Sequence, residues 1–312
     1  MRRPTTPAAT AAGRPHYPLA MSSSRISPTA HYTAWVWARN GLSHPALAAA
    51  VNPWLFRAGE LVLRPISALT RSQSVEAALL QRHHGIDTLL ERAITQHGVR
   101  QVVEVPGGLA SRGRRFVARH PDLVYVEGDL PGMAARKQAA LASDPHPRHH
   151  VVALDLLAED GPMSLEATAG ALLDPTVPTA FVTEGLLYYL APPLLDRAIR
   201  RTASFLAGFP DGHYFADLAI RGEGSPLVAG FLGLVSVVAR GRVRAHFHGS
   251  ADAVEQLRAR GFDSAQVLPA VSDPEAGPAP GEVFRVHLLR GRVGGAATAA
   301  GAATSDTVPE AR

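Results

Sequence analysis

The stretch QVVEVPGGLASRGRRFVARHPDLVYVEGDLP, residues 101–131, predicts a strand, a glycine-containing turn, a helix and a second strand. Its first apolar run ends at Pro106-Gly107-Gly108, where the two glycines let the backbone approach a ligand closely. The helix that follows points its free N–H groups toward this turn. The second strand carries Glu127 and Asp129 to the same edge of the sheet, where carboxylates suit ribose hydroxyls. This order is typical of a nucleotide-type cofactor site.

Composition limits the classes of function. The chain has 312 residues, of which 46% are hydrophobic, enough for one large α/β domain or two small ones. It has no cysteine, which excludes disulfides, thiolate metal sites and cysteine nucleophiles. The pI of 9.8 could indicate nucleic-acid binding. However, three arginines and no acid lie in the first 20 residues, which leaves about +1 of the formal +4 elsewhere. We therefore expect no nucleic-acid partner and no metal.

The ends of the chain differ from its middle. Residues 1–26 and 291–312 are rich in small and polar residues, and we expect both to be disordered tails, with Met1 or Met21 as the start. Between them we expect an N-terminal helical cap over 27–98 and a cofactor-binding domain over 99–290, with a lid insertion around 221–248. The longest apolar run, 226–239, is shorter than the roughly 20 residues that span a bilayer. We therefore expect a cytoplasmic protein without a membrane partner.

Strand-like and helical segments alternate through the middle of the chain, which predicts a mostly parallel α/β sheet with helices on both faces. The predicted cap helices cover 33–39, 46–50, 59–69 and 74–97, and the predicted strands cover 101–105, 123–126, 150–154, 180–183, 213–216 and 283–289. Ligands of such sheets bind beyond the carboxyl ends of the strands. Asp155 closes the third predicted strand and Glu184 closes the fourth. These acids therefore join Glu127 and Asp129 as candidates for one site.

Together these segments resemble the leucine carboxyl methyltransferase family, including bacterial O-methyltransferases related to polyketide carboxyl methyltransferases. The likeness covers roughly residues 28–290. Its most specific match is Glu184-Gly185-Leu186-Leu187-Tyr188-Tyr189-Leu190, and VYVEGDLPGMAARK from residue 124 is similar to the family's E-x-D-L-P segment followed by a basic residue. The resemblance implies a class I S-adenosylmethionine (SAM)-dependent methyltransferase. Its fold would be a seven-stranded Rossmann-like sheet with helices on both faces and an N-terminal helical cap.

The resemblance also implies a set of site residues. Arg82 would anchor the SAM carboxylate, Glu127 or Asp129 would hold the ribose, and Asp155 with the Leu156 backbone would lie along the adenine. In the family's turn motif G-A-G-L-D-T-R, Gly108 and Arg112 match, whereas Pro106 replaces a glycine and Ala110 replaces an aspartate. The full set of implied cofactor-binding residues is Arg82, Glu104, Gly107, Gly108, Glu127, Asp129, Asp155, Leu156 and Glu184.

Methyl transfer from a sulfonium depends mainly on alignment of donor and acceptor, so few side chains need take part in the chemistry. We expect a small-molecule acceptor with a carboxylate or hydroxyl group, in polyketide-type specialised metabolism. Tyr188 is a candidate for the acceptor pocket, and Arg240, Arg242 and Arg244 could anchor an acid or form a solvated basic face.

Two other classes of function stay open on the sequence. A catalytically silent binding protein with this fold would explain Pro106 and Ala110, since proline lacks the N–H that a cofactor turn uses. A nicotinamide dehydrogenase would share the Rossmann-type sheet. However, the G-x-G-x-x-G motif of dehydrogenases is absent, which disfavours that alternative.

Overall fold

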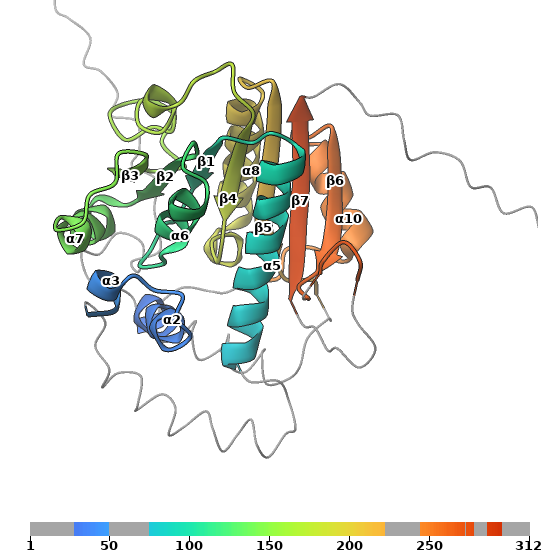
Figure 1. Ribbon diagram of the computed structural model, residues 1–312. Coiled ribbons are helices and arrows are strands. Elements are labelled where there is room, and N and C mark those ends of the chain that lie inside the picture. Colours follow the sequence, from blue (N-terminus) through green and yellow to red (C-terminus); the bar gives the residue numbers. More distant parts are fainter. Residues whose placement is uncertain (1–27, 50–74, 222–243, 272, 278–285, 295–312) are drawn as a thin grey trace, which may run out of the picture.

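The apolar runs of the sequence form adjacent strands of one sheet in the computed structural model, which describes residues 28–49, 75–221, 244–271, 273–277 and 286–294. Five strands are parallel, and the last two run antiparallel to their neighbours, in the order β3-β2-β1-β4-β5-β7-β6 (Figure 1). The strands are β1 (Gln101–Glu104), β2 (Val124–Asp129), β3 (His149–Ala153), β4 (Thr179–Thr183), β5 (Asp211–Leu218), β6 (Ser264–Pro269) and β7 (His287–Gly294).

The register of the parallel strands brings their carboxyl ends to one edge. Glu104, the last residue of β1, pairs with Glu127 of β2 on one side and with Val182 of β4 on the other. Asp129, at the end of β2, pairs with Ala153 at the end of β3. The loops after β1, β2, β3 and β4 therefore start close together, as the sequence predicted for a site at this edge.

Helices cover both faces of the sheet because side chains alternate between the faces along each strand. Val102 and Val182 belong to a core with α5 (Val75–Gln96) and α6 (Arg112–Arg119). Val103 and Phe181 point to the other face, into a second core with α8 (Pro192–Leu206) and α10 (Ser250–Arg258). The central strands β1 and β4 are thus buried on both sides, as their apolar sequences predict.

The cap lies beside the carboxyl edge of the parallel strands (Figure 1). It contains α2 (Pro28–Arg39) and the short helix α3 (Pro45–Ala49), which contacts α7 (Pro131–Leu141). Leu47 of α3 packs with Leu109 of the β1–α6 turn and with Leu141 of α7. The backbone N–H of His44 donates to the hydroxyl of Ser111. The cap is therefore attached directly to the turn that the sequence assigned to a cofactor.

Several predicted elements differ from the observed ones. Residues 283–285 of the strand predicted over 283–289 lie outside the described residues. The observed strand runs from His287 to Gly294, into the segment that the sequence assigned to a tail. The strand predictions omitted β6, because its exposed Ser264 and Gln266 weaken the apolar pattern. The second half of α5, assigned to the cap, packs on the sheet through Leu89 and Leu90. The helix predicted over 59–69 and the apolar run 226–239 lie outside the described residues.

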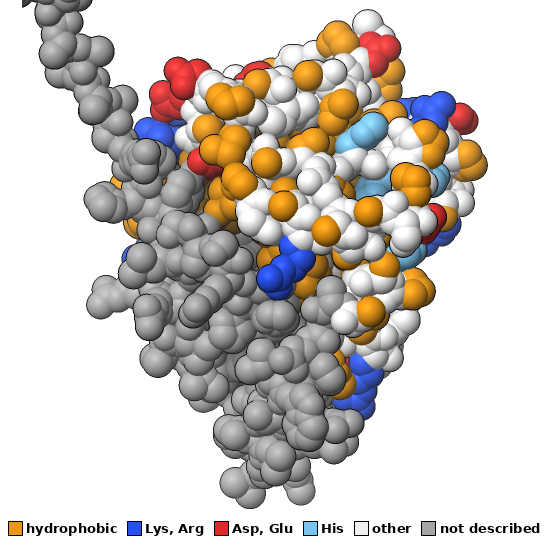
Figure 2. All heavy atoms as spheres, turned by 90° about the vertical axis from the view of Figure 1, so that its left-hand side faces the viewer, with side chains coloured by type: hydrophobic (Ala, Val, Ile, Leu, Met, Phe, Trp, Pro, Cys, Tyr) orange, Lys and Arg blue, Asp and Glu red, His pale blue; other side chains and the backbone are white. Residues whose placement is uncertain are grey.

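The face at the β3 edge of the sheet carries separate acidic and basic side chains among apolar ones, with no continuous basic band on its described residues (Figure 2). Histidine side chains gather toward one side of this face. Within the described ranges, no group of three or more His, Asp or Glu side chains has an arrangement that could hold a metal ion. Within the same ranges, no helix has the length and apolar character needed to span a membrane.

Candidate functional site

The β1–α6 turn, residues 105–111, lies at the centre of the candidate site. Its amides are held by neighbouring strands: the N–H of Val105 donates to the Val182 carbonyl and the N–H of Gly107 to the Gly128 carbonyl, both at 2.9 Å. The N–H of Gly108 donates to the Asp129 carboxylate, also at 2.9 Å. Pro106, which follows a cis peptide bond, lacks an amide N–H. The turn is nevertheless formed, because its hydrogen bonds come from the residues beside the proline.

The two glycines of the turn have different reasons to be glycine. A Cβ atom on Gly107 would lie 2.9 Å from the Cβ of Glu127, so strand β2 leaves no room for a side chain there. Gly108 has a φ of 48°, in the left-handed region that disfavours other residues. A Cβ atom on Gly108 would meet nothing within 4 Å, so open space lies beside the turn at this residue.

A buried lysine holds the turn from the protein interior. Lys137 of α7 is 1% exposed. Its Nζ donates to the carbonyls of Gly107 at 3.0 Å and Ala110 at 2.7 Å, and it forms an ion pair with Glu127. Glu127 in turn accepts the N–H of Gly113 at 3.1 Å and lies 3.3 Å from the Nε2 atom of His149. Burial raises the pKa of Glu127, but Lys137 and His149 outweigh it and lower that pKa to about 2. Glu127 is therefore ionised and enclosed.

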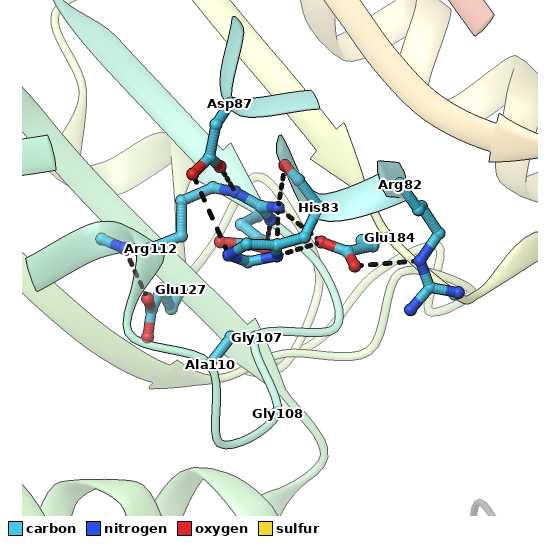
Figure 3. A network of polar contacts seen from close by, with 12 residues as sticks. Arg82, His83, Asp87, Gly107, Gly108, Ala110, Arg112, Glu127 and Glu184 are labelled. Atoms are coloured by element: carbon cyan, nitrogen blue, oxygen red, sulfur yellow. Dashed lines mark hydrogen bonds and ion pairs between the residues drawn. The ribbon is translucent and has the colours of Figure 1, made fainter. Parts of the chain in front are cut away.

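A second buried cation, Arg112, lies on the α5 side of the turn (Figure 3). It is fully buried at the start of α6. Its guanidinium pairs with Glu104 and Glu184, and its Nε donates to Asp87 at 2.6 Å. It also lies 2.7 Å from the Nδ1 atom of His83. Because three carboxylates and a histidine converge on one guanidinium, the structure ties the ends of β1 and β4 to helix α5.

Arg82 extends this network to the end of β5. Its Nε donates to Glu184 at 2.9 Å and its Nη1 to Asp217 at 3.1 Å. Asp217 is fully buried and also accepts the N–H of Gly185 at 2.7 Å. Burial, together with the nearby Asp217 carboxylate, raises the pKa of the Tyr188 hydroxyl. The loop after β4, which contains the family-like sequence from Glu184 to Leu190, is therefore anchored to both α5 and β5.

The charges of this network do not balance. Its carboxylates are Asp87, Glu104, Glu184 and Asp217, and its guanidinium groups are Arg82, Arg112 and Arg115, the last of which pairs with Asp87 at 2.8 Å. Burial raises the pKa of Glu104 to about 7, against the effect of Arg112, and burial also raises the pKa of Asp217. Burial opposes ionisation of Asp87 too, but Arg112 and His83 lower its pKa to about 2. Glu104 and Asp217 are therefore the carboxylates of this network that take up a proton most readily.

The remaining predicted residues lie at the ends of β2 and β3. Asp129 is half-buried, and its Oδ1 accepts the N–H of Leu130 at 2.8 Å while its Oδ2 accepts that of Gly108. Asp155 is 8% exposed, and its Oδ1 accepts the N–H of Leu157 at 2.8 Å. Leu156 is 5% exposed and belongs to the core that α8 covers.

The structure therefore groups the predicted residues into two sets. Gly108, Asp129 and Asp155 lie in the loops at the carboxyl edge or at the strand ends. Glu104 and Glu127 are both 1% exposed, and their carboxylates are occupied by Arg112 and Lys137. Arg82 and Glu184 are paired with each other, and Glu184 also pairs with Arg112, so they belong with the second set.

The sequence prediction of site residues omitted Asp217, His83, Asp87 and Lys137. Asp217 follows the same rule as Asp155 and Glu184, because it comes directly after the strand predicted over 213–216, so this rule could have identified it. Lys137 was recognised only as a basic residue after the E-x-D-L-P-like segment. His83 and Asp87 both contact Arg112, which lies 29 and 25 residues further along the chain, so the sequence did not reveal these contacts.

The model of the leucine carboxyl methyltransferase family matches residues 45–203, about half of the 312-residue chain. This chain belongs to that family. The matched region contains α5, α6, α7, the first four strands and most of α8. It therefore includes the β1–α6 turn and the two buried cations, Lys137 and Arg112. Asp217, in β5, lies beyond the matched region.

Individual relatives match a shorter part. A Mycobacterium bovis protein named for S-adenosyl-L-methionine-dependent methyl transfer is 41% identical over 108 residues, which are 34% of this chain and 30% of the relative. A Mycobacterium avium protein with the same kind of name is 37% identical over 144 residues, 45% of each chain. The alignments thus span less than half the length of these curated relatives.

Solved structures show the same fold. A Thermobifida fusca protein named a methyltransferase has a TM-score of 0.59 and 15% identity, over 89% of this chain and 98% of its own. A DUF574 family protein of Streptomyces avermitilis has a TM-score of 0.61 and 14% identity, over 85% of this chain and 97% of its own. The seven-stranded sheet of this member of the leucine carboxyl methyltransferase family is therefore that of class I methyltransferases, as the sequence predicted.

Proposed function

We propose that this protein transfers the methyl group of SAM to a carboxylate or hydroxyl oxygen of a small-molecule acceptor, in polyketide-type specialised metabolism. The observation that carries the proposal is the meeting of the glycine turn, Asp129 and the Glu184 loop at one edge of a class I methyltransferase sheet. Membership of the family and the names of the mycobacterial relatives support the reaction type. The acceptor class follows only from the family resemblance.

The residues at this edge fit the polar groups of SAM. Open space beside Gly108 leaves room for a ligand at the turn. Of the two acids proposed for the ribose, Glu127 is enclosed by Lys137 and His149, whereas Asp129 is half-buried at the strand end. We therefore assign the ribose to Asp129, whose carboxylate suits ribose hydroxyls. Asp155 and the Leu156 backbone are assigned to the adenine.

Arg82 is the residue proposed to hold the SAM carboxylate. Its ion pairs with Glu184 and Asp217 use Nε and Nη1, and a guanidinium has five N–H donors in a fixed plane. Glu184 then acts by orienting Arg82. Glu104 acts through Arg112, with which it forms an ion pair. Glu104 also accepts a hydrogen bond from the Tyr125 hydroxyl at 2.8 Å.

SAM supplies an electrophilic methyl group, and the protein must hold the acceptor in line with it. A carboxylate acceptor is already ionised at neutral pH and needs no general base, whereas a hydroxyl acceptor would favour one. Tyr188 is the proposed acceptor-pocket residue; burial and the nearby Asp217 raise the pKa of its hydroxyl, so this hydroxyl is protonated at neutral pH.

Calorimetric titration with S-adenosylhomocysteine (SAH) and SAM tests the cofactor, followed by methyl transfer to a panel of acids and phenols. We expect micromolar binding by the wild type and a loss of about tenfold or more in Asp129→Ala. The exposed acid Asp160 provides the control Asp160→Ala, which should bind as the wild type does. Absence of wild-type binding at millimolar SAH would overturn the proposal in favour of a silent binding protein. The bonded amides of Gly107 and Gly108 support a turn competent for the cofactor.

A further inference from the structure

Lys137 is the only lysine in the chain, and its ammonium group is buried against the cofactor turn. An ammonium has three N–H donors. Its three partners are the Gly107 carbonyl, the Ala110 carbonyl and the Glu127 carboxylate. Every donor is therefore used within the protein, and none is left for a ligand.

The two carbonyls that Lys137 binds flank Gly108, the residue beside the open space. The N–H of Gly108 donates in the opposite direction, to Asp129. Hydrogen bonds therefore hold the turn at the carbonyls of Gly107 and Ala110 and at the amide of Gly108. One ammonium group thus donates to both carbonyls.

We propose that Lys137 is a positioning residue of the SAM site, which fixes the β1–α6 turn in the conformation that receives the cofactor. This inference rests on the proposed function. It also explains how the turn tolerates Pro106 and Ala110. The lysine holds the carbonyl on either side of Gly108, so the turn does not depend on an amide at residue 106 or on a carboxylate at residue 110.

A purely structural role makes a different prediction. Lys137 also neutralises Glu127, and removing one partner of a buried ion pair costs about 3 to 5 kcal/mol, because the other charge is left unpaired. If charge neutralisation were the whole role, removing both charges together would restore the wild-type properties. If positioning is the role, the carbonyls of Gly107 and Ala110 still lack their donor when both charges are gone.

The test therefore uses the double variant Lys137→Met with Glu127→Gln, the single variant Glu127→Gln, and Gln138→Met as a control on the same helix. SAH affinity is measured by calorimetry. Amide hydrogen exchange of the peptide covering residues 105–111 is measured on each protein without ligand, with a peptide from α8 as internal reference. Exchange reports on the turn even when no ligand binds.

We expect the double variant to exchange at least about tenfold faster in 105–111 with α8 unchanged, and to bind SAH at least about tenfold more weakly. Glu127→Gln keeps the lysine donors and should keep the turn protected, as should Gln138→Met. Wild-type exchange and affinity in the double variant would overturn the inference. Exchange that rises in Glu127→Gln as much as in the double variant would also overturn it. Should the double variant not fold, Glu127→Gln alone decides. A wild type that fails to bind SAH removes the proposed function, while exchange still tests the role of Lys137 in the turn.

Discussion

Trp37 of the cap stacks on the imidazole of His83, with ring centroids 4.3 Å apart and ring planes at 28°. Trp37 is 4% exposed, and His83 is fully buried. The Nδ1 atom of His83 lies 2.9 Å from Glu184 and 2.7 Å from Arg112. One aromatic contact therefore connects helix α2 to the ion network under the candidate site.

Replacing Trp37 should destabilise the protein. Trp37→Leu removes the stack and leaves a cavity beside His83, which should lower the free energy of unfolding by about 2 to 3 kcal/mol. Urea unfolding measures this change. Trp35→Leu, on the same helix, is the control, because Trp35 is only partly buried. Equal losses in the two variants would show that the stack on His83 contributes nothing of its own.

Arg112 should be the most sensitive cation of the network. Arg112→Met leaves the buried carboxylates of Glu104 and Glu184 without their shared counterion, so we expect a loss of about 3 to 5 kcal/mol in unfolding free energy. Arg119→Met, at the exposed end of the same helix, should change it by less than about 0.5 kcal/mol. A loss below about 1 kcal/mol in Arg112→Met would contradict the central role of this guanidinium.

Asp87 should make the free energy of unfolding decrease as the pH falls. Its pKa is lowered from 3.8 to about 2 in the folded protein, against burial, by Arg112 and His83. The stabilisation is therefore fully present above pH 4 and is lost as the pH falls toward 2, and it amounts to about 2 kcal/mol. The difference in unfolding free energy between the wild type and Asp87→Asn should shrink over that range. A difference that stays constant from pH 5 to pH 2 would contradict the assignment.

Gly113 should not tolerate a side chain. A Cβ atom there would lie 2.6 Å from Oε1 of Glu127 and 2.7 Å from Nε2 of His149. Gly113→Ala should therefore displace the enclosed carboxylate and lower the melting temperature, with a loss of about 1 to 3 kcal/mol. Gly249→Ala is the matched control, because its Cβ would meet nothing within 4 Å and its backbone is extended. Thermal unfolding of both variants checks the prediction, which fails if they melt alike.

The sequence predicts the parallel half of the sheet well, because β1, β2, β4 and β5 are buried along most of their length and therefore contain apolar runs. The edge strand β6 is different: Ser264 and Gln266 face solvent, and within the strand only Ala265 is fully buried. A four- to six-residue alternation of this kind does not stand out from a loop. The strand predicted at the position of β7 ended at residue 289, before the observed end at Gly294, because Gly291 and Gly294 are typical of loops.

The candidate site was predictable where its residues follow strands, as for Asp129, Asp155 and Glu184. It was not predictable where side chains meet across the fold. Arg112 reaches Asp87 and Glu184 from positions 25 and 72 residues away, and no spacing in the sequence encodes such contacts. Sequence also could not separate Glu127 from Asp129, since both are acids on one strand; burial against Lys137 separates them.

The burial of Lys137 has a practical consequence for labelling. The chain contains no other lysine, and this one is 1% exposed with all its donors engaged. Amine-reactive dyes, biotin esters and coupling surfaces should therefore leave Lys137 unmodified in the native protein. The same reagents should modify this lysine once the protein is unfolded, so its labelling would report unfolding.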